Sequence, residues 1–350
     1  MDEDLFFDDV SIDHIRLYVR DLELASLTLG EKYCLASCHL ELPASSKEAE
    51  LSRCFCKDDI CIVLTQPLTL SHPGTEFLRR HGEGVADIAL TVSDATQAFS
   101  QSVLRGAVPH LAVQQKDGII SASIFGAGNL VHTFVQREAS GHQCVSGEGP
   151  SRKTVSGLHA FDHFAVCLQA GDLAAAAAFY MLALDFSVLY EEKIVVGKQS
   201  MNSKVVQNRS GRVTLTLIEP DLSYEAGQID SFIQKNNGAG VQHIALRTTD
   251  IVKSVQTLAD RGVDFLKSPS TYYQGLPERL ESLKYDVDKL MELSLLADQD
   301  HAGQLYQIFA KPSDPDCHFF FEIIERVGAK TFGSSNIKAL YDSVEMSEVL

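Results

Sequence analysis

The chain contains the same sequence pattern twice. Residues 238–263, GAGVQHIALRTTDIVKSVQTLADRGV, echo residues 82–107, GEGVADIALTVSDATQAFSQSVLRGA. Residues 163–189 echo residues 14–37 in the same way, and FFFEIIER near the end echoes LVHTFVQR. Self-similarity of this kind indicates a duplicated domain, so a fold for this chain must contain one structural unit twice.

Each copy predicts strands and a helix in the same order. An apolar strand pattern is followed by a helix, and several alternating segments come before the next copy begins. We therefore predict an α+β fold with duplicated βαβββ modules, each half forming curved, half-open mixed sheets. Residues 138–158 are polar and rich in Gly and Ser, which predicts a linker between domains at 1–137 and 159–350.

Three titratable residues each stand alone in an apolar strand of the second copy. They are His163, His243 and Glu322. A single strand histidine is usually a core or edge residue. Glu322 lies among Phe and Ile residues, so burying it requires a cation or a metal, unless it pairs with Arg326 or faces solvent. Two histidines and one carboxylate are the ligand set of a facial Fe(II) site.

The first copy carries different residues at the matching positions, namely His14, Asp87 and Thr133. This set lacks the two histidines and one carboxylate of the second copy. We therefore expect only the C-terminal half to hold a metal, with the N-terminal half a degenerate, structural copy. The alternative left open is that both sets are structural.

Composition narrows the class of protein. The chain has 350 residues, 45% of them hydrophobic, which suffices for about two domains with large cores. A net charge of −17 argues against nucleic acid and anionic membranes as partners. No apolar run approaches the ~18 residues of a membrane span, and the acidic N-terminus does not resemble a signal peptide. We expect a cytoplasmic protein whose eight cysteines are reduced thiols.

Two segments of the second copy have no counterpart in the first. Residues 271–300 have charges at i,i+4 spacing, which predicts an inserted helical segment. After Glu322, a Gly/Ser turn leads into an amphipathic pattern that predicts a C-terminal helix. A helix in that place suits a lid that excludes water from the site, or a helix that only packs on the sheet.

Several short motifs resemble the 4-hydroxyphenylpyruvate dioxygenase family. They are, in chain order, FDHFAV, IEPDL, GAGVQHIAL, SPSTYYQGL, LYQIFAKP, FFFEIIER and FGSSNIKALYDSVE. The resemblance is densest over residues 158–345. It implies the vicinal oxygen chelate fold, non-haem Fe(II) as cofactor, and 4-hydroxyphenylpyruvate and O2 as substrates. It also implies that the metal ligands are His163, His243 and Glu322.

Three positions depart from the dioxygenase pattern of that family. Thr216 and Ile218 stand where dioxygenases typically read P-x-N-E-P, and Ile337 replaces the final Phe of G-F-G-x-G-N-F. These residues resemble the 4-hydroxymandelate synthase branch, which hydroxylates the benzylic carbon instead of the ring. Because Ile218 lacks the donors and acceptor of Asn, we expect the substrate ring to lie differently. Replacing an aromatic side chain with Ile337 changes the cavity shape.

The resemblance also implies the substrate pocket and the reaction. Its substrate-binding residues would be Ser203, Thr216, Ile218, Gln228, Gln242, Gln307, Phe309, Phe320, Phe332 and Ile337. No catalytic residue is expected beyond the metal ligands. The predicted reaction gives 4-hydroxymandelate and CO2, for the hydroxyphenylglycine unit of peptide antibiotics. The alternatives are a dioxygenase that forms homogentisate and, more distantly, a non-catalytic ligand-binding protein; a homodimer is left open.

Overall fold

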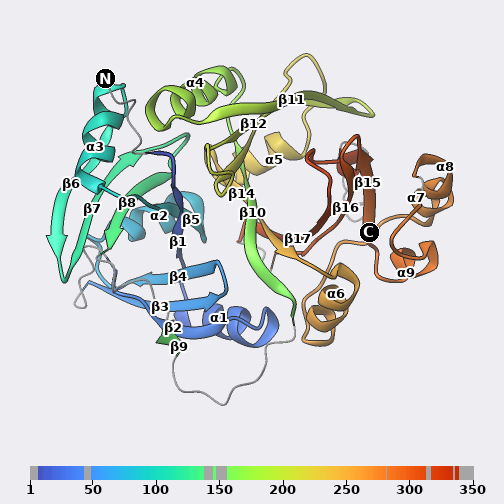
Figure 1. Cartoon of the computed structure of the whole chain (residues 1–350), viewed down its shortest axis with the longest axis horizontal. Coiled ribbons are helices and arrows are strands. Elements are labelled where there is room, and N and C mark those ends of the chain that lie inside the picture. Colours follow the sequence, from blue (N-terminus) through green and yellow to red (C-terminus); the bar gives the residue numbers. More distant parts are fainter. Residues whose placement is uncertain are drawn as a thin grey trace.

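Two mixed β-sheets, one from each half of the chain, form the framework of the protein. The structure is a computed structural model that describes residues 7–42, 49–137, 145–146, 156–280, 282–312, 317–333 and 336–338. Figure 1 shows the first sheet, in blue to teal, on the left and the second, in green to red, to its right. Within the described residues, no helix is both long and apolar enough to cross a membrane.

The first sheet has nine strands in the order β6-β7-β8-β5-β1-β4-β3-β2-β9. The strands are β1 (Ser11–Tyr18), β2 (Ala36–His39), β3 (Glu50–Lys57), β4 (Ile60–Pro67), β5 (Gly84–Thr91), β6 (Pro109–Lys116), β7 (Ile119–Phe125), β8 (Val131–Arg137) and β9 (Val145–Ser146). The helical segments of this half are α1 (Leu22–Leu27), the π-helical η2 (Thr28–Lys32), α2 (Pro73–His81) and α3 (Ala95–Leu104).

The second sheet has eight strands in the order β11-β12-β13-β10-β14-β17-β16-β15. The strands are β10 (Leu158–Cys167), β11 (Ser187–Val196), β12 (Gln199–Gln207), β13 (Thr214–Pro220), β14 (Gly240–Thr248), β15 (Leu296–Asp300), β16 (Gly303–Phe309) and β17 (Phe320–Val327). The helices are α4 (Leu173–Leu184), α5 (Gln228–Lys235), α6 (Ile251–Asp260), α7 (Ser270–Gln274), α8 (Leu276–Arg279) and α9 (Val287–Glu292).

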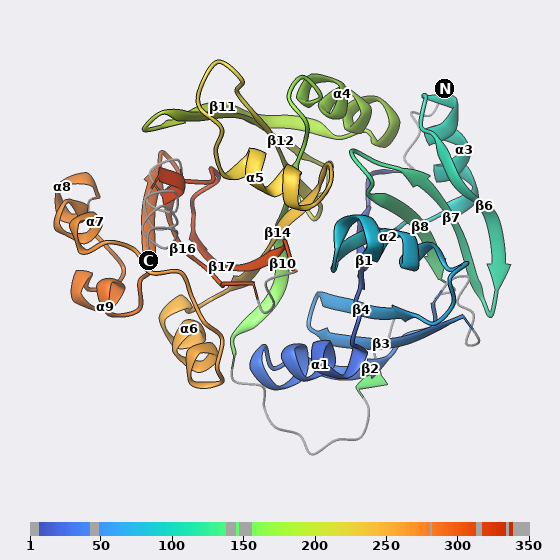
Figure 2. The ribbon, with the colours of Figure 1, turned by 180° about the vertical axis from the view of Figure 1, so that it is seen from behind.

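The two halves repeat one topology, which confirms the predicted duplication of βαβββ modules. The central strand β1 pairs in parallel with β4 and antiparallel with β5, and β10 pairs with β13 and β14 in the same two ways. Helices α3 and α6 begin at matching aspartates, because the side chains of Asp94 and Asp250 accept a hydrogen bond from the backbone three residues on. Figure 2 shows the matching helices α2 and α5 beside their own sheets.

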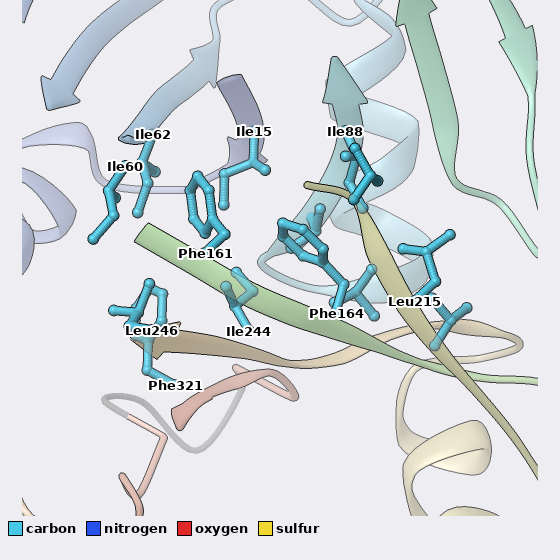
Figure 3. Packing of buried hydrophobic residues seen from close by; sticks show 14 of the residues in the cluster. Ile15, Ile60, Ile62, Ile88, Phe161, Phe164, Leu215, Ile244, Leu246 and Phe321 are labelled. Carbon is cyan, nitrogen blue, oxygen red and sulfur yellow. The ribbon is translucent and has the colours of Figure 1, made fainter. Parts of the chain in front are cut away.

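One apolar core joins the two sheets. A single cluster of buried side chains includes Ile15 and Ile62 of the first sheet together with Phe161, Phe164 and Ile244 of the second. In Figure 3, Phe161 lies between Ile15 and Ile244. Because successive strand residues point to opposite faces, burying this face leaves the alternate residues of β1, β10 and β14 on the other face of each sheet.

The predicted helical insertion at 271–300 is wrong at its C-terminal end. Short helices α7, α8 and α9 occupy much of it, but residues 296–300 form strand β15. Leu296 and Ala297 are buried, and β15 pairs antiparallel with β16. The charged residues that suggest a helix here instead alternate along an edge strand. Most of the predicted lid helix falls on 334–335 and 339–350, outside the described residues, while 336–338 are helical.

The linker at 138–158 is described only in part. Residues 145–146 form β9, which pairs with β2, and β10 already begins at Leu158. The domain limits 1–137 and 159–350 therefore stay predictions, although the two sheets divide the chain within this interval.

The expectation that every cysteine is a reduced thiol is not met. Cys38 and Cys56 form a disulfide, whereas Cys34, Cys54, Cys61, Cys167 and Cys317 are free and buried. The sequence did not show this pairing because the two residues are far apart along the chain. Antiparallel pairing of β2 with β3 brings them together.

Candidate metal centre

Three adjacent strands place the candidate ligands on one face of the second sheet. In the register, Ala245 of β14 lies opposite His163 of β10 on one side and opposite Glu322 of β17 on the other. His243 is two residues before Ala245, and side chains two residues apart on a strand share a face. The sequence-predicted residues His163, His243 and Glu322 therefore converge.

The ligand atoms of these residues form a compact group. The Nε2 atoms of His163 and His243 lie 3.6 Å and 3.4 Å from Oε2 of Glu322. All three ligand atoms lie within 4.8 Å of one another, and the group could hold a metal ion. Glu322 is only 2% exposed, so its carboxylate is removed from water. The two imidazole rings meet edge to face at a centroid separation of 5.5 Å.

Neighbouring side chains orient both imidazoles through their Nδ1 atoms. Nδ1 of His163 lies 2.9 Å from Oδ1 of Asp162, and Nδ1 of His243 lies 3.3 Å from Oε1 of Gln242. A proton on each Nδ1 donates to these oxygens, which leaves the lone pair of Nε2 free to face Glu322. Outer carboxylates and amides commonly fix the tautomer of metal-binding histidines in this way.

Arg326 does not neutralise Glu322. Instead, Nε and Nη2 of Arg326 donate to Asp162, which also accepts two hydrogen bonds from Arg247. This excludes one alternative, an ion pair between Glu322 and Arg326. Burial excludes the other, a carboxylate that faces solvent.

Burial changes the pKa values of all three candidate ligands. Removal from water, reinforced by the negative charge of Asp162, raises the pKa of Glu322 well above its ordinary value. Burial lowers the pKa of His163, and it lowers that of His243 well below its ordinary value with a further contribution from His163. The imidazoles are therefore neutral at physiological pH, as metal ligands must be, while a cation would favour the ionised Glu322.

A cavity of about 70 Å³ opens beside the three ligands. Nine of the ten residues predicted to bind substrate line it, namely Ser203, Thr216, Ile218, Gln228, Gln242, Gln307, Phe309, Phe332 and Ile337. The tenth, Phe320, stacks on His243 at a centroid distance of 5.3 Å. The cavity is far below the roughly 300 Å³ of ordinary small-molecule pockets, so an aromatic ligand must displace side chains on entering.

Comparison with known proteins identifies the family. A 4-hydroxyphenylpyruvate dioxygenase from Dictyostelium discoideum is 33% identical over 316 residues, covering 83% of this chain and 85% of the relative. The chain belongs to the 4-hydroxyphenylpyruvate dioxygenase family. The corresponding enzyme of Neurospora crassa is 31% identical, covering 78% of this chain and 71% of its own. The profile of the Glyoxalase/Bleomycin resistance protein/Dioxygenase superfamily also matches residues 160–279.

A solved structure that resembles the chain belongs to a different enzyme. The chain superposes on a mutant of 4-hydroxymandelate synthase from Streptomyces coelicolor with a TM-score of 0.86 and 36% identity, covering 97% of this chain and 98% of the other. These comparisons confirm the vicinal oxygen chelate fold and a non-haem iron dioxygenase as the class of enzyme. Two histidines with one carboxylate are the ligand types that such iron sites use.

Two polar atoms in the cavity wall lack partners. Oγ1 of Thr216 and Nε2 of Gln228 are buried without a hydrogen bond. Leaving a buried polar group unsatisfied costs about 1–3 kcal/mol, so such groups need an explanation. Because both residues line the cavity next to the candidate ligands, a polar bound molecule would supply the missing partners.

Sequence reasoning missed part of the site. The cavity is also lined by Tyr190, Glu192, Ile194, Met201, Val205 and Ile229. Alternation along the strands would have marked some of these positions as sharing a face, but not which face meets the ligands. The Asp162–Arg326 pair did leave a signal, because the first copy carries Asp13 and Arg137 at the matching positions.

The first half closes the matching positions with its own hydrogen bonds. Asp87 accepts hydrogen bonds from the backbone N–H and from Oγ1 of Thr133, at 3.1 Å and 2.5 Å. Nδ1 of His14 lies 2.6 Å from Asp13. A cavity of about 270 Å³ lies beside these residues, but within the described part of the chain they do not form a metal-binding group.

Proposed function

We propose that His163, His243 and Glu322 bind Fe(II). Their donor set is that of facial non-haem iron sites, and it leaves coordination positions open for other ligands. The fit rests on this structure: two Nε2 atoms converge on a buried carboxylate, while Arg326 donates its hydrogen bonds to Asp162 instead. When bound, Fe(II) supplies the chelation of a 2-oxo acid and the activation of O2.

We further propose that the chain converts 4-hydroxyphenylpyruvate and O2 into 4-hydroxymandelate and CO2. The observation that carries this proposal is the apolar wall formed by Ile218 and Ile337 in the cavity beside the ligands. The synthase from Streptomyces coelicolor, which resembles the chain over 97% of its length, supports it. Through this product, we propose a role in making the hydroxyphenylglycine unit of peptide antibiotics.

The protein side chains would act by positioning rather than by acid–base chemistry. Gln228, Gln242 and Gln307 offer amide groups to the polar ends of the substrate, while the rings of Phe309 and Phe332 provide an apolar surface for its ring. With Ile218 in the wall, the substrate ring lacks the polar anchor that an Asn would offer at this position. Misplacement by about 1 Å can change a rate by roughly a hundredfold, so the wall can choose between neighbouring carbons.

The second candidate is the dioxygenase reaction, which gives homogentisate. Curated relatives from Dictyostelium discoideum and Neurospora crassa are dioxygenases, and they favour it. Both reactions use the same substrates and the same proposed iron ligands. The pocket wall, and not the metal centre, therefore separates the two candidates.

The identity of the product decides between them. The full-length chain, loaded with Fe(II) under anaerobic conditions, is mixed with 4-hydroxyphenylpyruvate and O2, and the products are separated by chromatography because the two acids are isomers. We expect 4-hydroxymandelate with little or no homogentisate. Homogentisate as the main product would overturn the synthase proposal and leave the fold and the iron site standing.

A double variant tests the proposed cause. Ile218→Asn with Ile337→Phe should lower the yield of 4-hydroxymandelate and allow ring-oxidised products to form, because it restores a polar anchor and an aromatic wall. A complete switch is not expected, because other packed residues also set the position of the substrate. An unchanged product ratio would show that these two positions do not select the reaction.

A further inference from the structure

Four cysteines of the first half point to one face of its sheet. Cys54 and Cys56 are two residues apart on β3, and the register places Cys38 of β2 opposite Cys54 and Cys61 of β4 opposite Cys56. Residues two apart on a strand, and residues directly opposite on paired strands, project to the same side. Three adjacent strands thus bring four sulfur atoms together.

The sulfur atoms are spaced like the ligands of a thiolate metal site. Cys54, Cys56 and Cys61 form a triangle with Sγ–Sγ distances of 3.6, 3.4 and 3.2 Å. A tetrahedral Zn²⁺ site with Zn–S bonds of about 2.3 Å has sulfurs about 3.8 Å apart. The triangle therefore needs to open by only a few tenths of an ångström to accept an ion.

The fourth sulfur lies beside this triangle. Sγ of Cys38 lies within 4.8 Å of the sulfurs of Cys54 and Cys56, but the group within that distance does not include Cys61, so the side chain of Cys38 must move towards Cys61 when a metal binds. Cys38 is bonded to Cys56 in this structure, so only two of the four cysteines are thiols here. A dithiol reductant supplies the two electrons and two protons that convert this bond into two thiols, and is itself oxidised to a disulfide.

The surroundings suit a buried thiolate site. Cys54, Cys56 and Cys61 are only 6–7% exposed, and Val63, Leu40 and Leu42 pack against the group. Cys38 is only half-buried, which leaves a path for an ion to enter. Soft thiolate sulfur favours Zn²⁺, whereas nitrogen and carboxylate donors form the candidate iron centre of the other half.

The repeat shows where this cluster lies. Aligning the two halves by register places Cys38 at the position of Tyr190, and Cys54 at that of Val205. Tyr190 and Val205 line the cavity beside the candidate iron ligands. In the first half, two of the four cysteines therefore occupy positions that line this cavity in the second half, whereas Cys56 and Cys61 match Gln207 and Thr214, which do not line it.

We propose that the reduced chain binds one Zn²⁺ ion through Cys38, Cys54, Cys56 and Cys61. This site is separate from the iron centre and does not depend on the proposed reaction. Formation of the Cys38–Cys56 disulfide removes two of its ligands, so metal binding and the disulfide exclude each other.

Spectroscopy with Co²⁺ as a probe tests the site in the full-length chain. The protein is reduced, freed of reductant without oxygen, and titrated with Co²⁺. We expect a thiolate-to-cobalt charge-transfer band that saturates by two equivalents, because the candidate iron ligands can also take up Co²⁺, and that disappears when Zn²⁺ is added. His163, His243 and Glu322 contain no sulfur, so Co²⁺ bound there does not produce this band. The same protein with its disulfide intact should show no band.

Matched variants assign the ligands. Cys54→Ser and Cys61→Ser should each weaken Co²⁺ binding by more than the roughly 10–100-fold that an outer-shell substitution costs. Cys34→Ser is the control, because Cys34 is a buried free cysteine of the same half outside the cluster. Absence of the band in the reduced wild-type chain overturns the proposal whatever the variants do. An equally strong band with the disulfide intact, or an equal loss in Cys34→Ser, overturns it too.

Discussion

Asp13 and Asp162 stand at matching positions in the two halves, and each is held by a matching arginine. Nε of Arg137 donates to Asp13 over 2.9 Å, and Nε of Arg326 donates to Asp162 over the same 2.9 Å. In both halves the aspartate also contacts Nδ1 of the histidine that follows it. Both halves therefore contain the arginine, the aspartate and the histidine. Only the second half contains the full set of two histidines and one carboxylate. We conclude that the arginine–aspartate–histidine arrangement belongs to the module itself.

The halves differ at the ligand positions on the other two strands. In the first half, Asp87 is satisfied by two hydrogen bonds from Thr133. In the second half, burial raises the pKa of Glu322 well above its ordinary value, and the charge of Arg326, which is paired with Asp162, offsets this only in part. A buried carboxylate needs either internal donors or a cation. In the first half, Thr133 donates hydrogen bonds to Asp87. In the second half, Glu322 is left for a cation to bind.

Replacing one candidate ligand, Glu322, should produce the largest difference in iron binding between the two halves. Glu322→Ala should abolish Fe(II) binding and reduce turnover to background, because a three-ligand site has no ligand to spare. Thr133→Ala, at the matching position, should keep iron and turnover and lose only about 0.5–1.5 kcal/mol of stability, because the half-buried Asp87 loses one of its two hydrogen bonds and keeps the one from the backbone N–H. Metal analysis after anaerobic loading and the O2 consumption rate measure both. Loss of iron in Thr133→Ala would contradict the assignment of the two halves.

Replacing Arg137 or Arg326 should show which effects concern the stability of the fold and which concern metal binding. Arg137→Ala should destabilise the fold by about 3–5 kcal/mol, because it leaves the buried Asp13 without its arginine partner, and Arg326→Ala should destabilise it by less, because Arg247 still pairs with Asp162. Only Arg326→Ala should also weaken Fe(II) binding, by roughly 10–100-fold, because Asp162 orients a ligand. Urea unfolding and equilibrium dialysis give the two quantities. Equal losses of iron affinity in both variants would break the comparison.

The pH dependence of metal binding follows from the raised pKa of Glu322. In the metal-free chain that carboxyl holds a proton at pH values where an ordinary glutamate is ionised, and the metal must displace it. Fe(II) affinity should therefore fall by up to about tenfold per pH unit as the pH drops below the raised pKa. The lowered pKa values of His163 and His243 keep both neutral in this window. Calorimetry in two buffers of different ionisation enthalpy should detect proton release; none would refute this protonation state.

A smaller effect concerns Thr216, whose position is occupied by Val63 in the first half. Thr216→Val should leave stability equal or higher, because Oγ1 has no partner, and should raise KM by roughly 2–10-fold through one lost hydrogen bond. Thr214→Val is the matched control on the same strand. Its Oγ1 accepts a hydrogen bond from Gln207, so that variant should lose stability and keep KM. If Thr214→Val raised KM while Thr216→Val only lowered stability, Thr216 would not be a substrate-binding residue.

The sequence predicted the repeated fold and the convergence of the candidate ligands for a physical reason. His163, His243 and Glu322 are isolated polar residues on apolar strands, and the repeat places each at a position that matches His14, Asp87 or Thr133. The disulfide of Cys38 and Cys56 was not predictable in the same way, since it depends on the pairing of β2 with β3.

Other features depended on tertiary contacts as well. Strand β15 was included in the predicted helical insertion because the charges of residues 271–300 as a whole fit i,i+4 spacing, whereas pairing with β16 makes residues 296–300 a strand. Helix α2 was not predicted, although Pro73 stands at its first turn, because the segment is short and Phe77 and Leu78 are its only large apolar residues. The roles of the pocket residues stay predictions, since the geometry shows where they lie and not what they bind.

Iron stoichiometry tests the central claim of a single centre in the second half most directly. The wild-type chain, His163→Ala and His14→Ala are dialysed against Fe(II) without oxygen, and the iron bound per chain is measured. We predict one iron in the wild-type chain, none in His163→Ala and one in His14→Ala. Two irons in the wild-type chain, or loss of iron in His14→Ala with retention in His163→Ala, would contradict the account.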